Sequence, residues 1–256
     1  MRYYLLQIIT FCICCSCDDR MDIKKLPQIV TNDTTARKTP KQKITGIFGY
    51  RFIIYGDFNG DGKKDTLTEH FISDLSKQEM NKYYDGMEDM GDAIDTNAKL
   101  QPISFITSSN LLIDTLHIGA DAQVDGIEYI KNEGDLNNDG TDEIAYVINY
   151  LDWSSCNTCH IVTYKNNKWE ELYSFSIHDW QLPVLPLVNR SLRMKGFTDT
   201  VIKLSDTTTI EREKELMAYE GLITKLGKNK IRIEVDDPEN GVVSRAVNIS
   251  KKRKEK

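Results

Sequence analysis

Hydrophobic and polar positions alternate along most of the chain from Ile44 onward, in short runs that end at turn-forming residues. Residues 52–55 form an apolar run that stops at Gly56, and Trp169, Tyr173, Phe175 and Ile177 share one parity. A period of two is typical of strands that bury one face. Asn166 and Asn167 stand between two such runs and predict a hairpin turn, because Asn tolerates positive φ angles.

One segment departs from this period. Apolar side chains recur at helical spacing from Met80 to Ile94, and Ser76 with Glu79 forms a capping-box pattern before them. A second, shorter helix is compatible with residues 211–219. Strands and helices do not alternate regularly, which argues against a doubly wound fold. The sequence therefore predicts a mainly β fold of antiparallel hairpins and meanders, propeller-like or sandwich-like, with one inserted amphipathic helix.

The first 16 residues have the features of a targeting segment. Arg2 is followed by an apolar run over residues 3–13, which is too short to cross a bilayer as a helix. Ser16 is the small residue that signal cleavage prefers immediately before the cut, and Cys17 follows it. We expect a signal peptide over 1–16; a secretory signal that is cut elsewhere is the alternative.

Cys17 in this context resembles the lipobox cysteine of bacterial lipoproteins, which is acylated after cleavage. The acidic pair Asp18 and Asp19 resembles the surface-export signal of Bacteroidetes lipoproteins. The resemblance implies lipidation at Cys17, a membrane partner reached through the lipid anchor, and a location at the outer membrane or cell surface. Several buried acyl chains anchor a protein stably because each methylene adds about 0.8 kcal/mol.

The rest of the chain divides by composition. Residues 17–43 are polar without a persistent period and predict a flexible tether. Residues 44–250 form the expected β domain, and 251–256 form a basic, solvated tail. The net charge of −6 gives no support for a nucleic-acid partner.

Two acidic loops begin at Asp57 and Asp135 and share one pattern. Acids or amides stand at loop positions 1, 3, 5 and 9, with glycine at position 6. Calcium binds six to eight oxygens at about 2.3–2.6 Å, and a tight loop with alternate oxygen-bearing side chains supplies several of them. We expect two calcium ions. The expected ligands are Asp57, Asn59, Asp61, Asp65 and the Lys63 carbonyl in the first loop, and Asp135, Asn137, Asp139, Glu143 and the Thr141 carbonyl in the second.

These loops differ from EF-hands, which need a bidentate Glu at position 12 and flanking helices. Thr68 and Tyr146 occupy that position here, and strand-forming residues follow both loops. The pattern D-x-N-x-D-G-x-x-[DE] between strands resembles the FG-GAP/VCBS repeats of integrin-like β-propellers and bacterial surface proteins. The resemblance covers two segments of the chain and implies calcium at each loop. Ordinary hairpin turns are the structural alternative, because Asn-Gly and Asp-Gly pairs favour them.

Cys156, Cys159 and His160 lie close together between strand signals. Cys156 and Cys159 are the two cysteines that remain once the signal peptide is removed and Cys17 is acylated. In an exported chain they are consistent with a local disulfide or with a pair of free thiols. Their C-x-x-C-H spacing is also that of a c-type haem attachment site, which would make the protein an electron carrier.

The sequence favours a non-catalytic binding or interaction module that presents loops to a protein or glycan ligand. The alternative is a glycan-active enzyme, whose carboxylate pair sequence alone does not reveal. Trp153, Trp169 and Trp180 are candidates for a sugar-stacking platform, although buried aromatic residues are commoner. The sequence contains no G-x-S-x-G, Walker or dinucleotide-binding motif.

Overall fold

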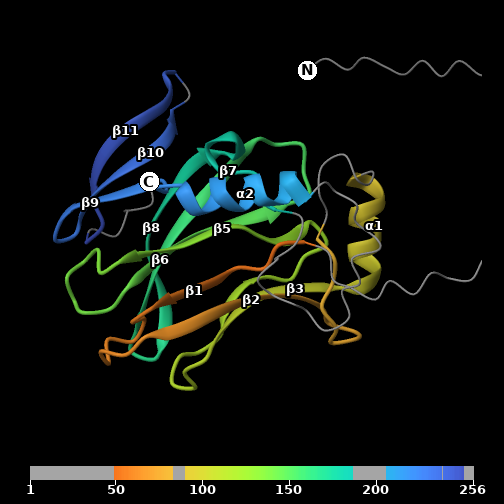
Figure 1. The fold of residues 1–256 in the computed structure, drawn as a ribbon, viewed down its shortest axis with the longest axis horizontal. Helices are drawn as coiled ribbons and strands as arrows, with labels where there is room; N and C mark the ends of the chain where they lie inside the picture. Colours follow the sequence, from red (N-terminus) through yellow and green to blue (C-terminus); the bar gives the residue numbers. More distant parts are fainter. Residues whose placement is uncertain (1–48, 83–89, 187–205, 238, 251–256) are drawn as a thin grey trace, which may run out of the picture. The chain divides into compact units, whose positions relative to one another are not determined.

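The computed structural model describes residues 49–82, 90–186, 206–237 and 239–250. The predicted signal peptide, the tether with Cys17, and the basic tail lie outside the described residues. Within them the fold is mainly β, with three antiparallel sheets, as the sequence predicts (Figure 1). None of the described helices has the length and apolar character needed to cross a membrane.

The first sheet is a four-stranded meander. Its strands are hydrogen-bonded in chain order: β1 (Ile53–Gly56), β2 (Asp65–Ser73), β3 (Pro102–Ser108) and β4 (Leu116–Gly119). Burial along β2 alternates strictly from residue to residue, so that Leu67, Glu69 and Phe71 are buried while Thr68 and His70 are partly exposed. The first acidic loop connects β1 to β2.

The second sheet repeats this arrangement. Its strands are again in chain order: β5 (Val124–Gly134), β6 (Glu143–Tyr150), β7 (Cys156–Lys165) and β8 (Lys168–His178). The second acidic loop connects β5 to β6. Each loop therefore joins the first two strands of a four-stranded antiparallel meander, and the sequence repeat is also a repeat of position in the fold.

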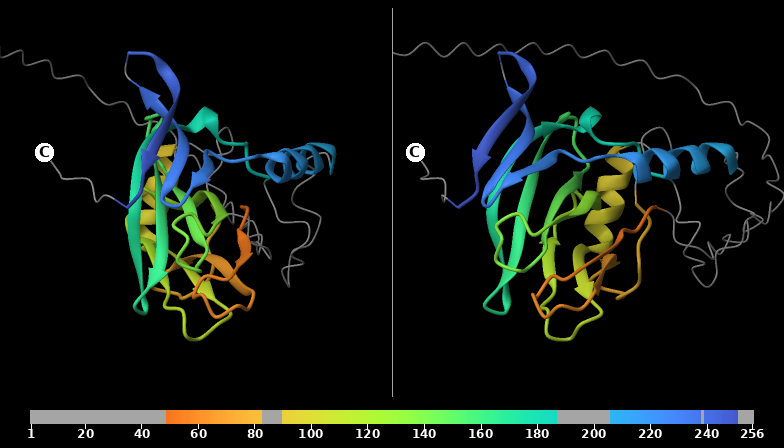
Figure 2. Two further views of the ribbon diagram at one scale, coloured as in Figure 1. Left: turned by 90° about the vertical axis from the view of Figure 1, so that its left-hand side faces the viewer. Right: turned by 60° about the vertical axis from the view of Figure 1, so that its left-hand side comes forward.

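The third sheet is smaller and has the order β11-β10-β9. Its strands are β9 (Ile223–Gly227), β10 (Lys230–Asp237) and β11 (Gly241–Asn248). The hairpin turn predicted at Asn166 and Asn167 is present, with φ of 53° and 60°, and Asn229 has a φ of 57° between β9 and β10. Figure 2 shows this sheet beside β8, which β10 contacts.

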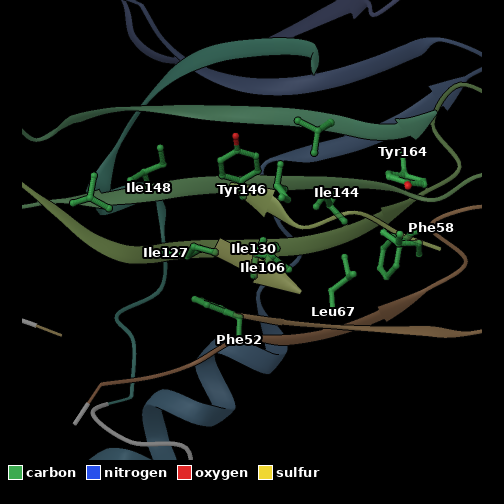
Figure 3. Close-up of a cluster of buried hydrophobic side chains, with 14 of the residues drawn as sticks. Phe52, Phe58, Leu67, Ile106, Ile127, Ile130, Ile144, Tyr146, Ile148 and Tyr164 are labelled. Atoms are coloured by element: carbon green, nitrogen blue, oxygen red, sulfur yellow. The ribbon is translucent and has the colours of Figure 1, made fainter. Parts of the chain in front are cut away.

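The second sheet is buried on both faces. One face packs against the first sheet in a core that includes Phe52, Leu67, Ile127 and Ile144 (Figure 3). The opposite face packs against the third sheet, in a second core of residues from β5 to β10: Tyr129, Val147, Ile161, Phe175, Ile177, Ile231 and Ile233. Residues 144–147 of β6 are all buried, as expected for a strand that is covered on both sides. The packing is sandwich-like.

The helices differ in part from the prediction. The inserted helix α1 (Met90–Leu100) begins only at Met90, and the expected residues 83–89 lie outside the described part. The capping-box prediction at Ser76 and Glu79 is wrong, because residues 74–76 form a turn and Glu79 pairs with β2 through an isolated bridge to Ile72. The helix expected near 211–219 corresponds to α2 (Asp206–Ala218), and the 3-10 turn η1 (Asp179–Gln181) follows β8.

Candidate metal centre

The side-chain oxygens of the first loop point back toward the loop backbone. Asp57 Oδ1 accepts the N–H of Asp61 at 3.0 Å, and Asp57 Oδ2 accepts the N–H of Gly62 at 2.8 Å. Asn59 Oδ1 also accepts the N–H of Asp61 at 3.1 Å, and Asp61 Oδ1 accepts that of Lys63 at 2.8 Å. Gly62 has a φ of 79°, which favours glycine at the bend.

The second loop repeats the bonds of positions 1 and 5, whereas its Asn137 at position 3 bonds differently. Asp135 accepts the N–H groups of Asp139 and Gly140, both at 3.1 Å. Asp139 Oδ1 accepts the N–H of Thr141 at 3.1 Å and its hydroxyl at 2.6 Å. Because these bonds gather the carboxylates inside a short turn, the two loops are equivalent in structure and not only in sequence.

The acids at position 9 are the most buried members of the set. Asp65 is 3% exposed and Glu143 is 0% exposed. Asp65 Oδ2 accepts the N–H of Phe58 at 3.3 Å, and Glu143 Oε2 accepts the N–H of Leu136 at 2.6 Å, so both close the loop onto its second residue. Among the described residues, no lysine or arginine forms an ion pair with either acid.

Glu143 shows what this burial costs. Desolvation and the charge on Asp139 raise the pKa of its carboxyl to about 7, against the hydrogen bonds from Thr163 and the loop backbone, which lower it. Asn137 donates its amide N–H to Glu143 Oε1 at 2.8 Å. Its own Oδ1 is buried and has no partner within the described part of the chain. The second loop thus holds a buried carboxyl without a cation and an amide oxygen without a donor.

The two loops are joined directly through Asp142. The N–H of Asp57 donates to Asp142 Oδ2 at 3.0 Å, and the N–H of Asp142 donates to the Asp57 carbonyl at 2.8 Å. Asn132 donates to Asp142 Oδ2 at 2.8 Å and to the Tyr55 carbonyl at 2.9 Å. A β-carbon on Gly56 would lie 2.3 Å from the Asn132 amide nitrogen, so a larger residue would displace this amide.

Sequence reasoning missed these joining residues. Asp142 stands at loop position 8, where a calcium loop needs no ligand and where the first loop has Lys64. The one signal available was that extra acid. Its role depends on how the two sheets pack, which the local pattern does not report.

Two lysines lie at the rim of the second loop. Lys165 Nζ lies 3.5 Å from Asp139 Oδ2. Lys225 Nζ contacts the Asp135 carbonyl and lies 2.6 Å from Asn138 Oδ1. Within the described ranges, one ligand atom each of Cys156, His178 and Asp236 lie within 4.8 Å of one another, and the acids of neither loop form such a group.

Cys156 and Cys159 are both free thiols. They are three residues apart in the extended strand β7, which places them on opposite faces: Cys156 is exposed and Cys159 is buried. Of the two alternatives that the sequence leaves open, the structure therefore has the pair of free thiols, and this geometry opposes a local disulfide. The same separation of the two thiols does not fit a haem attached through both. His160 instead pairs with Glu171 at 2.6 Å.

The three tryptophans do not form a platform. Trp153 precedes β7 and Trp180 follows β8, at the end of the hairpin where Cys156 pairs with His178, and they are 85% and 65% exposed. Trp169 lies at the opposite end of this hairpin, packed against Tyr164, and donates to the Asp114 carbonyl at 2.8 Å.

No protein-family model matches the chain, and neither a curated protein nor a solved structure gives a significant match.

Proposed function

We propose that each acidic loop binds one calcium ion, and that the two ions fix the edge at which the two four-stranded sheets meet. The observation that carries the proposal is the second loop's buried oxygen set, in which Glu143 has no cationic partner and Asn137 Oδ1 has no donor. A divalent cation compensates clustered oxygens of this kind. The ordinary hairpin alternative accounts for the glycines but not for the buried acid at position 9.

The loops need a modest rearrangement to coordinate an ion. The inward oxygens of Asp57, Asn59 and Asp61 now accept backbone N–H groups, and each would exchange part of that bonding for the cation. At the second loop, Lys165 would have to leave Asp139. Competition of this kind lowers affinity, so we expect dissociation constants of about 0.1–1 mM, as in extracellular modules.

Through Asp142, calcium binding at one loop would also affect the structure of the other loop. It joins the Asp57 backbone to the second loop, so an ion that orders one loop also orders the contact with the other. Both loops emerge at the junction of the two four-stranded sheets. The ions would therefore stabilise the contact between the two sheets. The domain would serve as a non-catalytic module that presents its loops to a protein or glycan ligand.

The repeated architecture supports the likeness to FG-GAP/VCBS repeats. Each loop lies between the first two strands of a four-stranded antiparallel meander, and four-stranded sheets are the blades of β-propellers. We propose that the chain carries two such units packed face to face, exported and held at the cell surface through acylated Cys17. A Cys17→Ala chain should leave the membrane fraction; if it still sediments with membranes, the anchor proposal is wrong.

Thermal unfolding tests the calcium proposal. We expect millimolar calcium, compared with EDTA, to raise the melting temperature of the full chain, because an ion that binds only the folded state stabilises it. Replacing Asp61 and Asp139 by Asn should remove most of the shift, whereas Asp95→Asn on α1, exposed and outside both loops, should keep it. An identical melt in calcium and EDTA contradicts the proposal.

A further inference from the structure

Three chemically reactive side chains meet at the edge shared by the second and third sheets. Cys156 begins β7, His178 ends β8, and Asp236 lies on β10. Strand register makes Cys156 and His178 direct neighbours. Cys156 Sγ lies 3.6 Å from His178 Nδ1, and Asp236 Oδ1 lies 2.8 Å from His178 Nε2. One ligand atom from each of the three residues lies within 4.8 Å of those of the other two.

We propose that Cys156 and His178 form a transition-metal site of the zinc class, distinct from the calcium loops. Zinc binds thiolate sulfur at about 2.3 Å and imidazole nitrogen at about 2.0–2.1 Å, so tetrahedral ligands of these types lie about 3.6 Å apart. The observed separation of Sγ and Nδ1 is 3.6 Å. Thiolate and imidazole ligands select zinc or copper over calcium and magnesium, which prefer oxygen.

Asp236 acts in this site as a positioning residue. A metal-binding imidazole usually donates its other N–H to a carboxylate, which fixes the tautomer and the ring orientation. The bond between His178 Nε2 and Asp236 Oδ1 has this arrangement and leaves Nδ1 facing the thiol. The ring is also stacked on Trp180, with centroids 3.7 Å apart and planes 17° from parallel. The ligand nitrogen is therefore held in place before any ion arrives.

The surroundings make this an open site. Cys156 is exposed, whereas His178 and Asp236 have side chains that are only 15% and 18% exposed, so an ion can enter from solvent on the thiol side. Ser155 places its carbonyl oxygen 3.3 Å from Nδ1 and thereby adds a hard oxygen beside the position of the ion. The remaining coordination positions are free for water or for a ligand from a binding partner, as in zinc sites that keep an open position.

Cobalt substitution tests the site directly. Cys12, Cys14, Cys15 and Cys17 are replaced by serine in every variant, which leaves Cys156 and Cys159 as the two thiols. Added Co²⁺ should give one thiolate-to-cobalt charge-transfer band that zinc abolishes and excess calcium does not. Cys156→Ser and His178→Gln should remove the band, and Asp236→Asn should weaken cobalt affinity about 10–100-fold.

The matched control is His160→Gln. His160 is also on this strand pair and also bonds a carboxylate, that of Glu171, but it has no thiol partner in the described structure. The cobalt charge-transfer band and the cobalt affinity of the His160→Gln variant should equal those of the parent. The site is refuted if the parent shows no charge-transfer band, or if the band survives Cys156→Ser or His178→Gln. Rapid acylation of Cys156 by a nitrophenyl ester, dependent on His178 but without metal binding, would identify a nucleophile instead. Since the acidic loops contain no thiols, a negative cobalt result would not change the calcium-dependent shift in melting temperature.

Discussion

Replacing Glu143 by glutamine separates the cost of its buried charge from its role in closing the second loop. Glutamine keeps the shape and can accept the N–H groups of Leu136 and Asn137, which Glu143 Oε2 now binds at 2.6 and 3.2 Å. Its amide N–H would face Asn137, whose Oδ1 lacks a donor in the described structure. A flip of the Asn137 amide would satisfy both side chains.

The magnitude follows from the raised pKa. Burial moves the pKa of Glu143 from 4.5 to about 7 in the folded protein. Each pKa unit corresponds to 1.36 kcal/mol, so keeping this carboxyl ionised without a metal costs at most about 3 kcal/mol. Because the folded state holds the proton more tightly, this cost is absent below pH 4.5 and grows as pH rises to about 7. Without calcium, Glu143→Gln should therefore be the more stable protein at pH 8 and show no advantage below pH 4.5.

Calcium should remove most of this difference at pH 8. An ion at 100 times its dissociation constant adds about 2.7 kcal/mol to the parent, whereas the variant lacks the charged ligand at its second loop. Urea unfolding followed by tryptophan fluorescence, at pH 4 and 8 and in EDTA or calcium, measures the free energy of unfolding of both proteins under all four conditions. Burial also raises the pKa of Glu128 to about 8 and of Glu133 to about 7, but these acids act equally in both proteins. Glu215→Gln, on the exposed side of α2, is the matched control.

The reasoning is refuted if Glu143→Gln is less stable than the parent at pH 8 in EDTA. That result would mean that the protein itself already compensates the charge of Glu143, and the buried carboxyl would no longer require a cation.

Three further substitutions test other contacts. Lys165→Met removes an ammonium group from the rim of the second loop and should tighten calcium binding several-fold by titration calorimetry, whereas Lys168→Met should not. Asp142→Ala deprives the Asp57 N–H of its acceptor and should lower the free energy of unfolding by about 1–3 kcal/mol in urea. Lys82→Met leaves Glu69, which is fully buried 2.6 Å from Lys82 Nζ, without its cation and should cost about 3–5 kcal/mol, with partial recovery on adding Glu69→Gln.

The strands and the loops could be predicted because their determinants are local. Period-two burial in β2 is visible in the sequence, and the loop geometry depends on bonds that span four or five residues, such as Asp57 to Asp61 and Gly62. The hydrogen bonds that join the two loops could not be predicted. Asp142 and Asn132 reach residues of another sheet, and nothing in the neighbouring sequence marks either residue as a contact.

The helix shows how a short local pattern can be overridden. Ser76 and Glu79 have the spacing of a capping box, but Glu79 bonds to Arg51 at 3.2 Å and to His70 at 2.9 Å. Burial raises the pKa of Glu79, yet these partners and the Phe71 backbone lower it below the ordinary value. A carboxylate bonded to the Arg51 guanidinium and to the His70 ring gains more than a helix cap supplies, since caps contribute about 1 kcal/mol. The segment therefore remains beside β2.

Cys156, Cys159 and His160 do not form one site, although their sequence spacing is that of a known motif, and the reason is geometric. C-x-x-C-H implies one shared site only where the backbone turns all three side chains the same way. In an extended strand, residues three apart face opposite sides, so Cys159 enters the core while Cys156 stays at the surface. Cross-strand register then gives Cys156 a different partner, His178, and the packing of a further sheet supplies Asp236. The chemistry open to a strand residue is set by its pairing partners and not by its neighbours in sequence.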